Sequence, residues 1–215
     1  MIKKIALILA LSLAICSFAY ADGAGTAVDN YFENKNTFTD LETYSWAEPA
    51  VYYLAEYGLV KSDNGRVYPG NYITRAEFTK LIVGAFGLYD YNAQCEFSDV
   101  SKSSEYYTYI ATAYELGIIN GVGNGRFGMD EYLMREDMAT IIYRTVQKYG
   151  TPLTEYPELD FVDKDDIFDY AKQPVSALVG AKAVSGNQDY MFLPKNKANF
   201  AEACKILYYI MIKNS

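Results

Sequence analysis

The sequence contains no histidine and only three cysteines, and these two scarcities exclude several kinds of functional site. Without histidine the chain lacks the commonest general base and the commonest metal ligand, so no Ser/His or Cys/His catalytic pair can form. The turn Asp63-Asn64-Gly65 lacks the alternating acids and the distal glutamate of a calcium loop. We therefore expect no enzymatic activity, no cofactor and no metal.

Positive charge is also scarce, because 19 Lys and Arg stand against 27 Asp and Glu, for a net charge of −8. Sequence-independent binding of nucleic acid or of an anionic membrane needs a basic face. We expect no nucleic-acid partner. An anionic ligand would have to be held by a local cationic site and not by the field of the whole protein.

The first 21 residues have the pattern of a secretory signal peptide. Lys3 and Lys4 precede an apolar run from Ile5 to Ala19, and the run ends at the small-x-small site Ala19-Tyr20-Ala21. This run is short for a bilayer about 30 Å thick, and no second apolar run follows it. We expect an exported protein without a membrane span.

Removal of the signal would leave two cysteines, Cys95 and Cys204. Export permits a disulfide, but two cysteines in a chain of this length do not make a disulfide framework. Two partly buried free thiols are the favoured interpretation, and pairing stays open.

Three similar stretches follow one another at intervals of roughly sixty residues, a spacing typical of a repeat architecture. They open with Phe38-Thr39-Asp40-Leu41, Phe97-Ser98-Asp99-Val100 and Phe161-Val162-Asp163. Each continues with an apolar periodic run, a turn and a second apolar run. We predict a polar linker at 22–37 and repeats at 38–92, 93–152 and 153–215.

The first repeat shows the pattern most clearly. Its first run ends at Gly58, as expected of a helix that stops at a glycine. After the turn, Thr74 and Glu77 have the spacing of a capping box, and apolar residues follow at helical intervals from Phe78 to Ala85. The sequence predicts helix, turn, helix.

The other two repeats keep this order with weaker signals. Met134 stands where Thr74 stands in the first repeat and cannot cap a helix, whereas Asn199 with Glu202 restores the cap and its acid. One such unit is too small to bury its own apolar stripes, so the three units must share a core. The fold class is therefore all-α.

The segment Ile73-Thr74-Arg75-Ala76-Glu77-Phe78, with the Phe-x-Asp openings and the Asp-Asn-Gly turn, resembles the S-layer homology repeat. Repeat 2 keeps the motif as Met134-Arg135-Glu136-Asp137, and repeat 3 has Phe200 in place of the arginine. The resemblance implies one pseudo-threefold helical bundle. It also implies binding of an anionic, often pyruvylated, secondary cell-wall polysaccharide in grooves between repeats, at the cell wall or S-layer.

Arg75 follows the capping residue Thr74 and should occupy the first helical turn, where a cation is unfavourable for the helix dipole. Folding alone would prefer an acid there, so we expect Arg75→Ala to leave stability little changed. Two interpretations stay open for Arg75, and by repetition for Arg135. One is a carboxylate clamp on the glycan, and the other is a structural ion pair.

Arg66 and Arg126 follow the turns of repeats 1 and 2 and are predicted as auxiliary glycan contacts. Met191 and Phe200 replace both cations in repeat 3, which predicts that this repeat has lost its anion site. Trp46, the only tryptophan, is predicted to shape a groove, with a place in the core as the alternative.

The leading hypothesis is non-covalent anchoring to the cell wall, with Arg75, Arg135, Arg66, Arg126, Trp46 and Thr74 at the glycan site. The rival is a structural envelope component that docks another envelope protein and no longer binds glycan. The rival is favoured by the lack of any cargo segment beyond the three repeats.

Overall fold

The computed structural model describes residues 38–213. The predicted signal peptide, 1–21, and the predicted linker, 22–37, lie outside the described residues. Within 38–213 the structure is helical and contains no strand, so the all-α prediction is confirmed. Its α-helices are α3 (Glu48–Glu56), α4 (Arg75–Ala85), α5 (Tyr107–Glu115), α6 (Arg135–Tyr149), α7 (Asp169–Gly180) and α8 (Phe200–Lys213). Two short 3₁₀ turns, η1 (Glu42–Tyr44) and η2 (Lys164–Asp166), precede α3 and α7.

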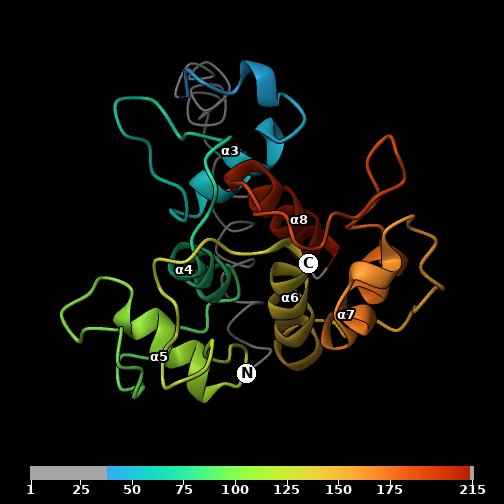
Figure 1. Cartoon of the computed structure of the whole chain (residues 1–215). Helices are drawn as coiled ribbons and strands as arrows, with labels where there is room; N and C mark the ends of the chain where they lie inside the picture. The colour runs from blue at the N-terminus through green and yellow to red at the C-terminus, as the bar shows by residue number, and fades with distance from the viewer. Residues whose placement is uncertain (1–37, 214–215) are drawn as a thin grey trace, which may run out of the picture.

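Each repeat contributes one outer and one inner helix to a closed ring. Figure 1 shows α4, α6 and α8 near the centre, with α3, α5 and α7 around them. The outer helix of each repeat packs on the inner helix of the repeat before it: α5 on α4, and α7 on α6. Helix α3 packs on α8, which closes repeat 1 onto repeat 3. Every repeat therefore needs its neighbours to bury its helices.

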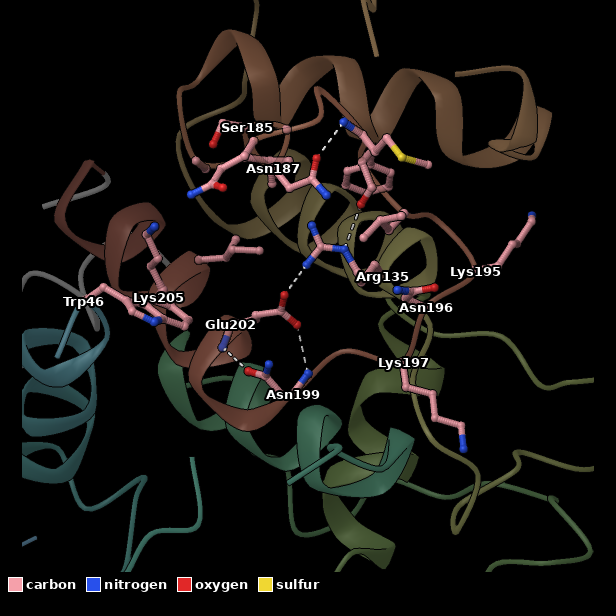
Figure 2. A pocket seen from close by; sticks show the side chains of 18 of the residues that line it. Trp46, Arg135, Ser185, Asn187, Lys195, Asn196, Lys197, Asn199, Glu202 and Lys205 are labelled. Atoms are coloured by element: carbon pink, nitrogen blue, oxygen red, sulfur yellow. Dashed lines mark hydrogen bonds and ion pairs between the residues drawn. The ribbon is translucent and has the colours of Figure 1, made fainter. Parts of the chain in front are cut away.

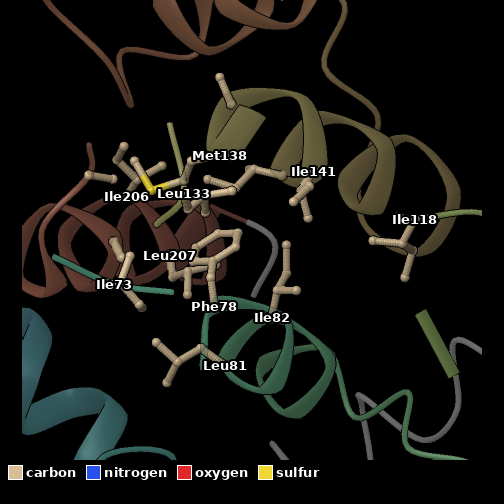
Figure 3. Packing of buried hydrophobic residues seen from close by; sticks show 14 of the residues in the cluster. Ile73, Phe78, Leu81, Ile82, Ile118, Leu133, Met138, Ile141, Ile206 and Leu207 are labelled. Atoms are coloured by element: carbon tan, nitrogen blue, oxygen red, sulfur yellow. The ribbon is translucent and has the colours of Figure 1, made fainter. Parts of the chain in front are cut away.

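The core lies between the three inner helices (Figure 3). Phe78 and Ile82 of α4, Met138 of α6 and Leu207 of α8 are almost completely buried. Burial of each such side chain contributes roughly 1.5–3 kcal/mol. The apolar faces of the helices, which one repeat alone would leave exposed, are thus buried against the other two repeats.

A ring of three main-chain hydrogen bonds joins the repeats just before the inner helices begin. The amide of Ile73 donates to the carbonyl of Ala198 (3.0 Å), that of Ala198 to Leu133 (2.8 Å), and that of Leu133 to Ile73 (3.0 Å). One residue from each repeat takes part, and each both donates and accepts. This ring marks a pseudo-threefold axis.

The aspartate of each Phe-x-Asp opening holds the loop of its own repeat. The carboxylate of Asp99 accepts from the main-chain N–H of Phe127 and of Gly128, both at 2.7 Å. Asp163 accepts in the same way from Phe192 (2.8 Å) and Leu193 (2.7 Å).

Asp40 makes the corresponding pair of contacts with Val67 and Tyr68 in repeat 1. Burial opposes the charge of Asp99, but its main-chain donors outweigh burial and lower the pKa of this carboxyl group. Asp163 is buried, although acidic residues follow it closely in the sequence.

The helix ends follow the sequence signals with one exception. Thr74 and Glu77 form the predicted capping box, Asn199 and Glu202 form its equivalent, and Met134 makes no side-chain cap. Gly58 and Gly117 adopt positive φ after α3 and α5, as a helix-ending residue does. In repeat 3 the residue in this conformation is Lys182, with φ 62°, whereas Gly180, the last residue of α7, does not have positive φ.

Two first-turn arginines, Arg75 and Arg135, connect α4 and α6 to the loop of the following repeat. Arg75 donates from Nε to the carbonyl of Phe127 (3.0 Å) and from Nη2 to that of Asn120 (2.9 Å). Its guanidinium carbon lies 5.0 Å from the Phe127 ring centroid. Arg135 repeats the arrangement with the carbonyl and ring of Phe192, at 2.9 and 5.2 Å.

Arg75 is only 8 % exposed. The expectation that Arg75→Ala leaves stability unchanged considered the helix dipole alone. The structure adds hydrogen bonds to another repeat, and their loss outweighs the few tenths of a kcal/mol gained at the dipole.

We predict that Asp163→Ala lowers the free energy of unfolding by about 2–4 kcal/mol, because two main-chain N–H groups lose their acceptor. Urea unfolding followed by circular dichroism measures this change. Asp165→Ala is the matched control, since Asp165 is exposed and should change stability by less than about 0.5 kcal/mol. Equal stability of the two variants would show that Asp163 does not hold the loop.

We also predict that Arg75→Ala lowers the free energy of unfolding by about 2–4 kcal/mol, because the carbonyls of Phe127 and Asn120 lose a charged donor. Arg66→Ala serves as control, since Arg66 is exposed. The same urea titration applies. An Arg75→Ala protein as stable as the control would restore the view that this arginine is free to serve a ligand alone.

Candidate functional site

A groove of about 1090 Å³ opens between repeats 2 and 3. We call it the 2–3 groove. Arg135 at the start of α6 lies on its floor, the loop 183–199 of repeat 3 surrounds it, and Trp46 and the first turns of α8 form the far wall (Figure 2). All three repeats therefore contribute to this groove.

The 2–3 groove is positively charged although the protein is acidic. Arg135, Lys195, Lys197 and Lys205 line it, and Glu202 is the only carboxylate among the described residues that do. Glu202 forms an ion pair with Arg135 at 2.5 Å. The groove is thus the local cationic site that an anionic ligand would need.

Its cations differ in their partners. Lys195 forms an ion pair at 2.6 Å with Glu136, whose side chain is fully buried. Lys197 and Lys205 have no carboxylate within 4 Å in residues 38–213, and Figure 2 shows them on opposite sides of Arg135. These two ammonium groups can accept an anionic partner without breaking an ion pair.

Trp46 lines the 2–3 groove and is 46 % exposed, so the alternative that placed it in the core is wrong. The ammonium of Lys205 lies 5.2 Å from its ring centroid, which orients both side chains. An exposed indole beside a cation can stack on the apolar face of a sugar ring while the cation meets an acidic substituent.

Side-chain amides supply most of the neutral polar surface of this groove. Asn187, Gln188, Asn196 and Asn199 line it. Asn187 accepts from the main-chain N–H of Asp189 (2.9 Å) and of Met191 (3.0 Å), which fixes the turn that carries it. Amides both donate and accept, which suits sugar hydroxyl groups.

The equivalent groove between repeats 3 and 1 has a volume of about 300 Å³ and a different character. We call it the 3–1 groove. Phe200 takes the place of Arg135 in it, and Val67 takes the place of Phe192. Burial opposes the charge of Lys80 in this groove, but the hydrogen bond to Glu105 outweighs burial and raises the pKa of that lysine.

The loss of arginine at position 200 therefore affects a different groove from the one expected. We predicted that repeat 3 has no anion site, since Met191 and Phe200 replace its cations. A first-turn residue reaches the loop of the following repeat, so Phe200 lies in the 3–1 groove. The loop of repeat 3 meets Arg135 of repeat 2 instead and forms the cationic groove.

At the third equivalent position, between repeats 1 and 2, three of the protein's own side chains contact one another. Arg75 lies 3.9 Å from Asp137, and the hydroxyl of Tyr170 donates to Asp137 at 2.8 Å. Burial, followed by this contact with Asp137, raises the pKa of Tyr170. A glycan role for Arg75 stays a prediction, whereas its contacts with the protein are those of a buried structural residue.

The other predicted site residues lie apart from the 2–3 groove. Arg66 is exposed at its turn, 5.7 Å from the Tyr68 ring centroid, and Arg126 forms an ion pair with Glu131 at 2.8 Å. Thr74 is used as a helix cap. Among the six predicted residues only Arg135 and Trp46 line the 2–3 groove.

Sequence reasoning missed the lysines and asparagines of the 2–3 groove. The run Pro194-Lys195-Asn196-Lys197 was a usable signal, because it places two cations and an amide directly before a helix cap. Comparison of the repeats did not predict it, because Lys195 and Lys197 do not align with the arginines that repeats 1 and 2 share.

Both remaining cysteines are buried free thiols, so the structure supports the unpaired interpretation. Burial raises the pKa of Cys204 and of Cys95, which disfavours the reactive thiolate. None of the helices in 38–213 has the length and apolar character that a bilayer span requires.

Comparison with known proteins agrees with the repeats. The chain is 33 % identical over 189 residues to an amylopullulanase of Thermoanaerobacterium thermosulfurigenes, covering 85 % of this chain and 10 % of the relative. It is 32 % identical over 185 residues to the exoglucanase XynX of Acetivibrio thermocellus, covering 83 % and 16 %. With the S-layer protein sap of Bacillus anthracis, identity is 31 % over 179 residues, covering 80 % and 21 %.

The chain thus spans about a tenth to a fifth of the length of these relatives. The model of the S-layer homology domain matches residues 37–79, 96–139 and 160–204. The three matches correspond to the three helix–turn–helix units that the structure closes into a ring. The chain therefore belongs to the S-layer homology domain family, with three tandem repeats.

Proposed function

We propose that this protein attaches non-covalently to the cell wall by binding an anionic secondary cell-wall polysaccharide in the 2–3 groove. The observation that carries the proposal is the pair of lysines, Lys197 and Lys205, which have no carboxylate within 4 Å in the described part of the chain, 38–213, and stand on either side of Arg135. In a protein with a net charge of −8, such a groove selects an anion by local contact.

The geometry suits a sugar with an acidic substituent more than a simple anion. Trp46 offers a ring for stacking, the asparagines offer hydrogen bonds, and the lysines offer charge, all in one open groove. A pyruvate ketal places one carboxylate on the edge of a sugar ring, so it can meet a lysine while the ring meets Trp46. The S-layer protein among the relatives favours attachment at the cell wall in general.

Arg135 has a double role in this proposal. It supports the loop of repeat 3 through the Phe192 carbonyl, and it presents a guanidinium already paired with Glu202. A ligand carboxylate would meet a cation whose position is fixed before binding, which lowers the entropy lost on association. The two lysines give the groove its excess positive charge. Arg135, whose charge is balanced by Glu202, gives a hydrogen-bond donor in a fixed position.

We expect no catalysis, because the groove offers Glu202 as its only carboxylate and this group is committed to Arg135. Hydrolysis of a glycosidic bond by the usual route uses two carboxyl groups on either side of the bond. The activities named for the amylopullulanase and exoglucanase relatives are stated of those proteins, most of whose length lies outside the match.

The proposal predicts that residues 22–215 co-sediment with wall sacculi that retain their secondary polymer and not with sacculi stripped of it. Mild acid, which cleaves ketals before most glycosidic bonds, should abolish co-sedimentation if the carboxylate is a pyruvate ketal. Retention after acid treatment would point to another acidic substituent. Equal binding to native and stripped sacculi would rule out the glycan and favour a protein partner.

The Lys197→Gln/Lys205→Gln variant should bind purified polymer at least about tenfold more weakly, since each charge-assisted contact contributes roughly 1.5–3 kcal/mol. Isothermal titration measures the affinity, and the loss should shrink as salt rises. Lys102→Gln is the matched control, because Lys102 is exposed and lines neither groove. Unchanged affinity in the double variant would refute the assignment of the site.

A further inference from the structure

Two tyrosines and a lysine meet above the hydrogen-bonded ring at the pseudo-threefold axis. Tyr72, Tyr132 and Lys197 are equivalent residues of the three repeats, each one position before a member of the ring. The Tyr72 and Tyr132 ring centroids lie 5.6 Å apart. The Lys197 ammonium lies 4.4 Å from the Tyr132 ring centroid and 5.4 Å from that of Tyr72. We call these three residues the axial cluster.

Folding does not account for the aromatic character of the axial cluster. The ring beneath it is built from main-chain groups, which any residue provides. Tyr72 is 52 % exposed and Tyr132 is 47 % exposed, so about half of each side chain remains in water. Lys197 has no carboxylate within 4 Å among residues 38–213. Two exposed rings and an unneutralised cation are features of a binding surface.

The axial cluster continues the 2–3 groove without interruption. Tyr72 and Lys197 both line that groove, and Tyr132 extends the surface beyond it. Tyr72 also lines the 3–1 groove, so the two grooves meet at this residue. A linear chain that leaves the 2–3 groove at its Lys197 end therefore passes over the tyrosine rings.

We propose that the axial cluster is an extended subsite for the same wall polysaccharide, in which successive sugars stack on Tyr72 and Tyr132. The inference rests on the proposed function, and it adds that the protein binds a stretch of several sugars and not a single terminal unit. Lys197 lies at the junction of the two parts, where it can pair with an acidic substituent on either of two neighbouring sugars.

The chemistry of the cluster favours a glycan over a protein partner at this place. Stacking on an aromatic face tolerates different sugars, because most sugar rings have an apolar face of C–H groups. On its groove side the cluster is next to Asn196 and Lys195, whose amide and ammonium groups can meet sugar hydroxyl groups and acidic substituents. The occupant it fits is polar, ring-shaped and anionic.

The test compares ligands of increasing length. The probes are a methyl hexoside carrying a 4,6-pyruvate ketal and size-separated fragments of the polymer released from the same sacculi. Wild-type affinity should rise with fragment length until the axial cluster is filled. In Tyr72→Ala/Tyr132→Ala, affinity for fragments of four or more sugars should fall about tenfold for each ring removed, the order known for stacking on aromatic side chains. In the single variant Tyr132→Ala, affinity for the single sugar should stay within about twofold, because the Tyr132 side chain is not part of the lining of the 2–3 groove.

Tyr91→Ala is the control, since Tyr91 is also exposed and lines neither groove. Circular dichroism should show that all variants are folded. If the double variant keeps the full length dependence, or if Tyr132→Ala weakens short and long fragments equally, the extended subsite is wrong while the 2–3 groove stands. If the wild type binds no fragment of any length, the proposed function fails and this inference fails with it.

Discussion

The closed ring of main-chain hydrogen bonds among Ile73, Leu133 and Ala198 is the constraint on which the rest of the structure depends. Each residue donates to one neighbour and accepts from the other, so the ring is complete only when all three repeats are present. It sets the starting points of α4, α6 and α8 around a common axis. Packing of the core side chains, such as Phe78 and Met138, then follows from that placement.

The ring also explains why neighbouring repeats share each groove. Because an inner helix starts at the axis, its first-turn side chain points at the loop of the next repeat. Arg75 meets the carbonyls of Asn120 and Phe127, and Arg135 meets that of Phe192. Asp99 and Asp163 of the Phe-x-Asp openings accept from the main-chain N–H of Phe127 and of Phe192, the residues whose carbonyls the arginines contact. Arginine, loop and aspartate form one structural unit assembled from two repeats.

One architecture thus provides three grooves that have diverged in chemistry. Between repeats 1 and 2, Arg75 and Tyr170 both contact Asp137, while the 3–1 groove is apolar around Phe200. The 2–3 groove alone among these three combines an exposed tryptophan with lysines that lack a carboxylate partner in the described chain. A repeat protein can specialise in this way because a substitution at a loop or a first turn changes one groove and leaves the ring intact.

The local structure could be predicted from the sequence because its causes are local. The Thr74–Glu77 box, the failed cap at Met134 and the stop at Gly58 depend on residues within one or two helical turns. Periodicity likewise predicted the helix–turn–helix units, and the Phe-x-Asp openings predicted the number of repeats. The positive φ of Lys182 after α7 was not predicted, because lysine rarely adopts this conformation and so gives no signal for it in the sequence.

The site could be predicted only in part, because the residues that line it lie far apart in the sequence. Arg135 and Trp46 were predicted, but Lys197 and Lys205 join them only after α3 has closed onto α8. The sequence by itself determined the repeats, their helices and the family. Tertiary structure decided that Arg75 is buried and that the loop of repeat 3 carries the cationic groove. The physical reason is that ring closure brings each first-turn side chain against the loop of the following repeat, and no pattern of neighbouring residues in the sequence predicts that contact.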